Sequence, residues 1–184
     1  MQTLDESLKV RNSVFGREQN IPAYISRDQI DANFIKFLSL QEKRQINNSR
    51  YIAIRLEKTG EIIGTGRVDV QSNYFKGGTW GCMKYIAVRE EYCSAEVGRL
   101  IVEKLEMEAM RLHPKLNGLY LNSHTFGTSF YRKLGYIVHE EEMIKVAGTS
   151  FVLCEKPFPN EYGIETEDSL KPLYNRIIME LSDY

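Results

Sequence analysis

Two stretches of the chain combine residue types that could bind a phosphate group and deliver a proton. The first, Lys84–Met110, reads as a short apolar strand, a polar turn ending at Gly98 and an amphipathic helix, KYIAVREEYCSAEVGRLIVEKLEMEAM. A helix N-terminus after a strand favours anion binding, because free backbone N–H groups and the helix dipole converge there. The second, Ser129–Tyr136, reads as a short helix with an aromatic pair, SFYRKLGY. Its Tyr131 could supply a proton, so the pattern predicts a group-transfer enzyme with a phosphate-bearing cofactor.

Hydrophobic periodicity predicts the elements that must position these residues. Helices are expected at Leu4–Phe15, Ile30–Leu40, Ala95–Leu112 and Thr128–Leu134. Strands are expected at Tyr51–Glu57, Ile62–Val70, Trp80–Val88, Leu119–Asn122, Tyr136–Glu140 and Ser150–Glu155. Gly60 is placed for a hairpin turn and Gly135 for a helix C-cap. This order predicts an α+β fold, layered α/β/α, whose mixed and mostly antiparallel sheet is flanked by helices.

The last part of the chain is predicted to be an addition to this domain. Residues 1–156 form the expected domain, and Pro157–Asp168 reads as a polar linker within the segment 157–184. Ser169–Tyr184 is expected to be a helix, with an apolar face made of Leu170, Leu173, Ile177, Ile178 and Leu181. Such a face must be covered, either by the domain itself, by a second copy in a homodimer, or by an open sheet edge that the helix caps.

Composition excludes several classes of protein. The 184 residues suit one domain, and 42% hydrophobic with 27% charged residues argues against disorder. A net charge of −1 lacks the electrostatic footprint of a nucleic-acid-binding protein. Three scattered cysteines predict neither a disulfide framework nor a metal site. The sequence shows no signal peptide and no apolar run of membrane-spanning length, so a cytoplasmic protein is expected.

Three motifs carry a resemblance to a known family. They are VRNSVFGREQNIP at Val10–Pro22, the segment Tyr85–Leu105, and FYRKLGY at Phe130–Tyr136 followed by Glu140–Lys156. The chain from Leu8 to Lys156 resembles the GNAT superfamily of acetyl-CoA-dependent N-acetyltransferases, and FYRKLGY is the most specific motif. That family normally opens with a strand before its first helix. Here the chain starts almost at the helix, so the first strand is either lost or its pairing is supplied otherwise.

The resemblance implies a donor site for acetyl-CoA. The family's pyrophosphate loop reads Gln or Arg, two residues, Gly, one residue, then Gly or Ala. Cys93, Glu96 and Gly98 occupy these positions, so only the last glycine is retained. The Glu96 carboxylate could repel phosphates unless it points into solvent, whereas Arg99 could add favourable charge. An ordinary strand-to-helix turn whose acid complements the helix dipole is the alternative. The implied cofactor-binding residues are Ile86, Ala87, Val88, Cys93, Ser94, Glu96, Val97, Gly98, Arg99 and Asn122.

The resemblance also implies a catalytic tyrosine. Tyr131 aligns with the residue that faces the CoA sulfur and acts as general acid, and a phenol with a pKa of about 10 suits that task. Its neighbour Phe130 is expected in the core. His124 is a candidate base because histidine titrates near neutrality, although a loop histidine is more often a surface residue. Asp69 and Glu18 are further candidates for proton uptake or substrate contact, and either could equally be a solvated acid.

Three functions remain open at this point. The first is transfer of an acetyl group from acetyl-CoA to a primary amine of a small molecule or protein. The second is a non-catalytic binding module, motivated by Cys93 and Glu96 in the phosphate loop. The third is an acyl-homoserine-lactone-synthase-like acyltransferase, because Arg11, Phe15, Asp28 and Asp31 match the spacing seen in those enzymes. FYRKLGY favours the first of these. The acceptor amine is not encoded by any motif in the sequence.

Overall fold

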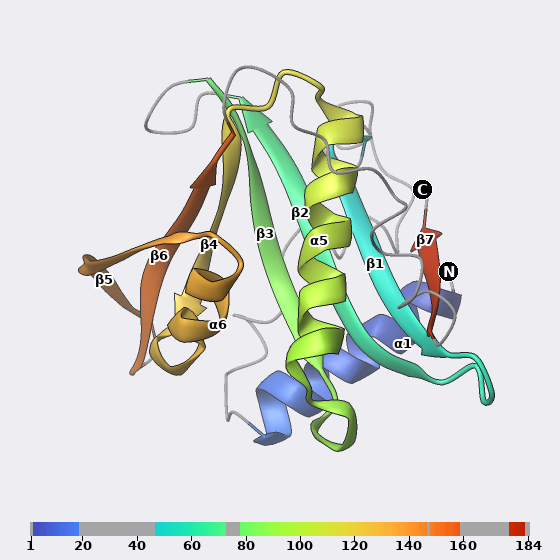
Figure 1. Cartoon of the computed structure of the whole chain (residues 1–184). Coiled ribbons are helices and arrows are strands. Elements are labelled where there is room, and N and C mark those ends of the chain that lie inside the picture. The colour runs from blue at the N-terminus through green and yellow to red at the C-terminus, as the bar shows by residue number, and fades with distance from the viewer. Residues whose placement is uncertain (1, 19–46, 73–77, 147, 159–176, 183–184) are drawn as a thin grey trace.

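A seven-stranded sheet forms the centre of the molecule (Figure 1). The computed structural model describes residues 2–18, 47–72, 78–146, 148–158 and 177–182. The strands are β1 (Ser49–Leu56), β2 (Ile62–Ser72), β3 (Thr79–Val88), β4 (Gly118–His124), β5 (Ile137–Val146), β6 (Thr149–Pro157) and β7 (Ile177–Ser182). The helices are α1 (Gln2–Arg11), the π-helix η1 (Asn12–Glu18), α5 (Ala95–Leu112), α6 (Thr128–Lys133) and the short 3₁₀ turns η2 (Glu90–Tyr92) and η3 (Thr125–Gly127). The predicted α+β class is confirmed.

The sheet is forked between β3 and β4, which pair over part of their length and then separate. Its order is β5-β6-β4-β3-β2-β1-β7, and every neighbouring pair is antiparallel except β3 and β4. In the described residues, the parallel register of that pair covers only Trp80–Cys82 against Gly118–Tyr120. Both strands then continue, to Val88 and to His124. Figure 1 shows them separating, with α5 on the side of β3 and α6 on the side of β4.

Each face of the β1–β3 half is covered by a helix. Helix α5 packs on one face, where its buried residues Leu100, Ile101 and Leu105 join a core with Ile52, Val68 and Tyr136. The backbone of β2 approaches this helix closely, since a Cβ atom at Gly66 would lie 2.8 Å from Leu105 Cδ1. Helix α1 and η1 pack on the opposite face, where Val10 and Val14 form a smaller cluster with Ala53, Ile62 and Ala87. The sheet is therefore the middle layer of three in this half.

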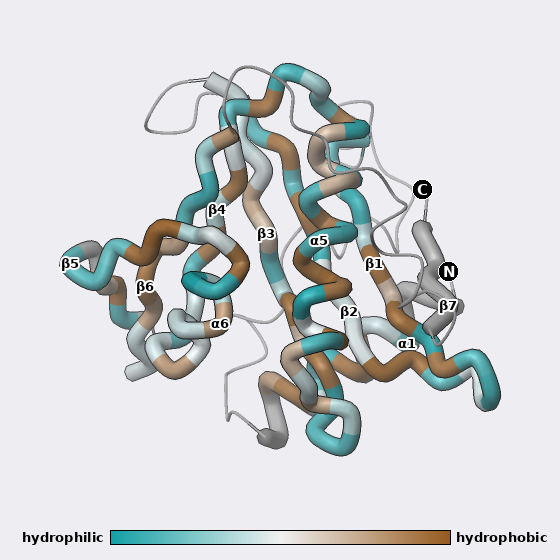
Figure 2. Tube along the Cα trace, in the orientation of Figure 1, coloured by the Kyte–Doolittle hydropathy of each residue, from teal (hydrophilic) through white to brown (hydrophobic). Residues whose placement is uncertain are grey.

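Local sequence accounts for the positions of these elements. The hairpin between β1 and β2 turns at Gly60, which has a φ of 70° and donates to Leu56 O at 2.8 Å. Helix α5 begins after Ser94, whose side chain caps it, and ends before His113-Pro114. Gly135 has a φ of 85°, as its predicted place after α6 requires. Figure 2 shows the hairpin as hydrophilic and the strands beneath α5 as largely hydrophobic.

The prediction of a C-terminal helix over Ser169–Tyr184 is wrong for the residues that the structure describes there. Ile177–Ser182 forms β7, which pairs antiparallel with β1 at the sheet edge (Figure 1). The apolar residues Ile177, Ile178 and Leu181 fit a strand as well as a helix, and β-branched residues favour the strand. Of the two alternatives for the missing opening strand, the second applies, because β7 from the other end of the chain supplies the pairing beside β1. Residues 159–176, and the helix predicted at Ile30–Leu40, lie outside the described residues. Within the described segments, no helix combines the length and apolar character that crossing a membrane demands.

Candidate functional site

A bulge in β3 lies next to the point where the sheet forks. Tyr85 and Ile86 stand opposite Gly66 alone, because Thr65 pairs with Ala87 and Arg67 pairs with Lys84. Tyr85 has a φ of 55°, and among the described residues it is the one non-glycine residue with positive φ. Such a conformation costs about 1–3 kcal/mol and persists where the surroundings hold it in place. The bulge therefore marks Tyr85 and Ile86 as residues whose backbone is not set by register pairing with β2.

The strand leads from this bulge to the N-terminus of α5. Ser94 is the N-cap, and its hydroxyl accepts a hydrogen bond from Val97 N at 3.3 Å. Gly98 N donates to Ser94 O at 3.2 Å as the helix begins. The amides of Ala95 and Glu96 precede the first intrahelical bond, so they point off the end of an 18-residue helix. This end offers two N–H donors and the positive end of a helix dipole to an anion.

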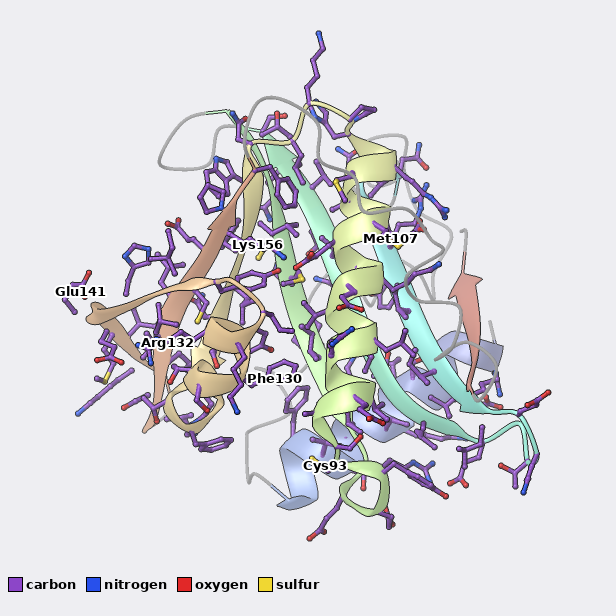
Figure 3. The ribbon with its side chains drawn as sticks, in the orientation of Figure 1. Cys93, Met107, Phe130, Arg132, Glu141 and Lys156 are labelled. Atoms are coloured by element: carbon purple, nitrogen blue, oxygen red, sulfur yellow. The ribbon has the colours of Figure 1, made fainter. Side chains whose placement is uncertain are left out.

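The side chains of the turn before α5 point outward. Cys93, Ser94 and Glu96 are exposed, whereas Val97 is buried in the core. The Glu96 carboxylate therefore has room to stay in solvent, which answers the objection that it must repel phosphate. Arg99 is exposed as well, and its Nε lies 2.8 Å from Glu103 Oε1 in the next turn. That ion pair draws the guanidinium along the helix, away from the N-terminal amides. Figure 3 shows Cys93 at this end of α5.

Gly98 has a structural reason to be glycine. A Cβ atom there would lie 3.1 Å from Phe130 Cζ, so the ring of Phe130 presses directly on the helix backbone. Figure 3 shows Phe130 reaching from α6 toward the first turns of α5. Phe130 packs against the main core, in line with its predicted role. The glycine that the sequence links to the phosphate loop thus also lets α6 pack against the start of α5.

Tyr131 is buried beside that contact. Its ring lies edge-on to Phe130 at 5.1 Å between centroids and to Tyr136 at 5.8 Å. Its relative exposure is 9%. Burial raises the pKa of the Tyr131 phenol well above its usual value, with a smaller contribution from Cys154. In the described part of the chain, no group accepts a hydrogen bond from its hydroxyl. Tyr131 therefore carries its proton throughout the physiological range.

The end of β4 carries two further candidates. Asn122 is exposed on the strand, and His124 lies at its last position. The His124 ring stacks on Phe126 with centroids 3.8 Å apart and meets Phe151 edge-on at 5.8 Å. Partial burial lowers the pKa of His124, so the ring is neutral at pH 7 and able to accept a proton. Neither residue has a hydrogen bond to Tyr131 among the described contacts.

Asp69 belongs to a buried charged cluster on the face of the sheet that α1 covers. Its Oδ2 lies 2.8 Å from Arg67 Nη2 and 3.1 Å from Lys84 Nζ. Arg67 also donates to Tyr51 Oη at 3.1 Å. Asp69 Oδ1 is buried and has no hydrogen-bond partner in the described part of the chain. We call Arg11, Tyr51, Arg67, Asp69, Lys84 and Tyr85 the Asp69 cluster.

A second polar network connects α5 with the other half of the sheet. Glu106 Oε1 accepts hydrogen bonds from Tyr136 Oη at 2.7 Å and from Lys156 Nζ at 3.1 Å. Figure 3 shows Lys156 reaching from β6 toward α5. Burial raises the pKa of Glu106, although Lys156 and Tyr136 oppose the shift. We call Glu106, Tyr136 and Lys156 the Glu106 bracket. It spans the fork, because α5 packs on β1–β3 and Lys156 lies on β6.

The structure brings only some of the predicted site residues together. The residues from Ile86 to Arg99 are continuous through the turn into α5, and Phe130 connects Tyr131 to that helix. Asp69 lies on the other face, and His124 lies on the far strand of the fork. Glu18 ends η1, and its side chain is outside the described part. Sequence reasoning did not find Arg67, Lys84 or Glu106, because single charged residues in apolar strands and helices carry no motif.

The arrangement suits a long ligand with a phosphate group. The fork separates two strand edges, and the α5 N-terminus at its open end supplies backbone donors. Exposed small side chains at Ser94 and Ala95 leave these donors accessible. In the described residues, no group of three or more His, Cys, Asp or Glu side chains is arranged to hold a metal ion. The donors that are present fit a phosphate group.

Comparison with known proteins agrees with this geometry. The family model described as "Acetyltransferase (GNAT) domain" matches residues 15–157. An uncharacterized N-acetyltransferase of Bacillus subtilis, YjcF, is 30% identical over 148 residues, which cover 80% of this chain and 87% of YjcF. A second protein of that organism, YyaT, is 29% identical over 153 residues, covering 83% of this chain and 88% of its own.

Solved structures share the fold at lower identity. An acyl-CoA N-acyltransferase from Pseudomonas aeruginosa matches with a TM-score of 0.62 at 16% identity, over 83% of this chain and 89% of its own. Escherichia coli ElaA matches with a TM-score of 0.62 at 21% identity, over 85% and 91% of the two chains. At these identities the likeness concerns the arrangement of helices and strands.

Proposed function

We propose that this chain, which belongs to the GNAT superfamily of acetyltransferases, moves an acetyl group from acetyl-CoA to a primary amine. It is an acyltransferase by family, and members of this family use acyl-CoA donors and amine acceptors. The observation that carries the proposal further is the pairing of a buried, protonated Tyr131 with the open N-terminus of α5, through Phe130 on Gly98. Tyr131 would be the proton donor and the α5 N-terminus the anion site, and the packing of Phe130 on Gly98 connects the two.

Donor binding would use backbone groups more than side chains. The amides of Ala95 and Glu96 would donate to the pyrophosphate, with the dipole of α5 behind them. The edge of β3 between the bulge and Val88 would donate to the acyl and pantetheine parts. Asn122 on β4 would contact the donor from the other side of the fork. This explains how a loop with Cys93 and Glu96 in place of the family's side chains can still bind the donor.

The chemistry requires few groups, because a thioester supplies an already activated acyl carbon. The amine would attack directly, with its orientation set by the site. Tyr131 would then give its proton to the departing sulfur. Burial keeps the Tyr131 phenol protonated, and the same desolvation would raise the basicity of a thiolate that forms beside it, so that the sulfur could take the proton.

The attacking amine must lose a proton, and three residues are candidates for accepting it. His124 is neutral at pH 7 because burial lowers its pKa. Asp69 has one buried oxygen free of described partners, although Arg67 and Lys84 hold the other. Glu18 ends the π-helix η1, in the motif that resembles the loop over the acceptor site. Of the three we favour His124, because its ring is in the neutral form that can accept a proton and because it lies at the end of β4, one of the two strands of the fork.

The test is acetyl-CoA binding followed by CoA release with a panel of primary amines. Titration calorimetry is expected to give micromolar binding, and thiol detection should show release that depends on the amine. His124→Gln should lower the rate of CoA release at pH 7. Binding without release for any amine would contradict an enzyme of this specificity.

A non-catalytic binding module is the second candidate, motivated by Cys93 and Glu96 at the mouth of the donor site. Glu96→Gly separates the two functions. If the loop already binds the donor through backbone amides, this variant should change the dissociation constant of acetyl-CoA by less than about threefold, since an exposed carboxylate is well screened. No binding by the natural chain, with binding restored in Glu96→Gly, would favour the module.

A further inference from the structure

The strained residue of the bulge, Tyr85, packs against two buried arginines. The Tyr85 ring has the guanidinium of Arg11 over it at 4.3 Å from the centroid and that of Arg67 at 5.0 Å. Building on the proposed function, we propose that Arg11 and Arg67 are positioning residues. They hold Tyr85 in its left-handed conformation and so fix the backbone of Ile86–Val88 toward the donor thioester.

The three side chains come from three different elements. Arg11 is the last residue of α1, Arg67 lies in the middle of β2, and Tyr85 lies in β3. Both guanidinium groups also lie near the Tyr51 ring of β1, at 5.4 Å and 5.5 Å. The Arg67 guanidinium is held further by the hydrogen bonds that it donates to Asp69 and to the Tyr51 hydroxyl. Tyr85 is therefore linked directly to α1 and β2, and through the two guanidinium groups to Tyr51 of β1, which helps a strained backbone to persist.

Burial indicates that these arginines do not contact the substrate. Both have a relative exposure of 0%. A side chain without exposed surface cannot touch a ligand that enters from solvent unless the protein rearranges. Desolvation also strengthens the attraction between a cation and an aromatic face. The pair therefore acts through the Tyr85 ring, and any effect on catalysis must pass through the backbone of the bulge.

The position of the bulge gives this contact a consequence for the reaction. The described register between β3 and β4 ends at Cys82, so Tyr85–Val88 border the open part of the fork. The bulge also interrupts the β2–β3 register on the other side. Ala87 and Val88 pair with Thr65 and Gly64 of β2, so the conformation of Tyr85 sets how this paired end of β3 continues from the bulge. If Tyr85 lost its left-handed conformation, donor affinity would stay nearly unchanged, because the α5 amides would still bind phosphate. The thioester carbon of the donor, however, would be misplaced for attack by the amine.

The first experiment compares two substitutions of the ring. Tyr85→Gly removes the strain, because glycine adopts positive φ without penalty, whereas Tyr85→Leu keeps the strain and removes the aromatic face. The expected kcat of Tyr85→Gly is at least about fivefold above that of Tyr85→Leu, with similar donor dissociation constants. Equal kcat values, or a faster Tyr85→Leu, would overturn the proposal. Both variants keep Arg11, Arg67 and Asp69, and urea denaturation of each variant checks that it is folded before the kcat values are compared.

The second experiment substitutes the arginine that makes no ion pair with Asp69. Arg11→Met should lower kcat about tenfold with little change in the donor dissociation constant, and Arg11→Lys should recover part of the loss. In the Tyr85→Leu background, Arg11→Met should have almost no further effect. A full effect in that background would overturn the proposal. The matched control is Arg55→Met, which removes an arginine paired with Glu6 of α1 at 2.9 Å and should leave kcat within about twofold.

A third readout does not depend on activity. Amide hydrogen exchange at Ile86–Val88, measured without substrate, should rise about tenfold in Arg11→Met and stay unchanged in Arg55→Met. This outcome is expected even if no amine tested supports turnover. Unchanged exchange at these amides in Arg11→Met would overturn the proposal, whereas absence of turnover in the natural chain would count against the proposed function alone.

Discussion

The Asp69 cluster and the Glu106 bracket bury charge in two different ways. The cluster lies within the β1–β3 half on the face that α1 covers, and its Arg11 and Arg67 have no exposed surface. The bracket lies on the α5 face, and the side chain of its Lys156 is 30% exposed. The cluster fixes a strained segment inside one half, whereas the bracket connects the two halves across the fork. The two halves of the sheet are thus joined by the short parallel register of β3 and β4 and also by the side chains of the bracket.

The largest effect should come from removing the single carboxylate of the Asp69 cluster. Asp69→Asn leaves Arg67 and Lys84 in place without the charge that both contact. Breaking a buried ion pair in this way is expected to lower the free energy of unfolding by about 3–5 kcal/mol. Urea denaturation measures this loss of stability, and substitution of the exposed Glu57 of the β1–β2 hairpin, Glu57→Gln, is the control. A loss below about 1 kcal/mol would mean that the cluster contributes little to the fold.

The Glu106 bracket should give a smaller effect that depends on pH. The raised pKa means that folded Glu106 binds its proton more tightly than the unfolded chain does. Stability should therefore fall as pH rises from the ordinary value of 4.5 toward the raised value, and level off above it. Glu106→Gln cannot titrate, so the stability of the natural chain relative to that of the variant should fall over this range of pH. Urea denaturation between pH 4 and 8 checks the sign, and a difference that grows with pH would contradict the assignment.

The smallest effect is expected at an exposed ion pair of the β4–β6 half. Arg132 Nη2 lies 2.8 Å from Glu140 Oε1, with side-chain exposures of 55% and 68%. Arg132→Gln should change stability by less than about 0.5 kcal/mol, because solvent screens both charges. A loss of stability as large as that of Asp69→Asn would show that burial is not the reason why the Asp69 cluster contributes more stability than an exposed ion pair. Thermal or urea unfolding is sufficient for this measurement.

The sequence predicted the elements well where hydrophobic period and capping agreed. Ala95–Leu112 was predicted with the bounds that α5 has, because Ser94 and Pro114 mark its two ends. The C-terminal segment was mistaken for a helix, because Ile177, Ile178 and Leu181 satisfy either period and pairing with β1 is a long-range contact. Long-range pairing has no local signature, so periodicity could not decide it.

The site residues show the same contrast between local motifs and long-range packing. Residues in contiguous motifs, such as the turn into α5 and FYRKLGY, were named in advance, and the packing of Phe130 on Gly98 brings these two motifs together. Arg67, Lys84, Tyr85 and Glu106 receive no role from the sequence, because what distinguishes them is burial, a partner or a backbone angle. Each of these properties arises only when distant elements pack, so a single sequence carries no sign of it.

The most direct test of the central claim is the turnover of Tyr131→Phe. This variant keeps the ring between Phe130 and Tyr136 and removes only the hydroxyl. With an amine that supports CoA release by the natural chain, the account predicts that kcat falls by about 100-fold or more while acetyl-CoA binds with an unchanged dissociation constant. A kcat equal to that of the natural chain would contradict Tyr131 as the proton donor.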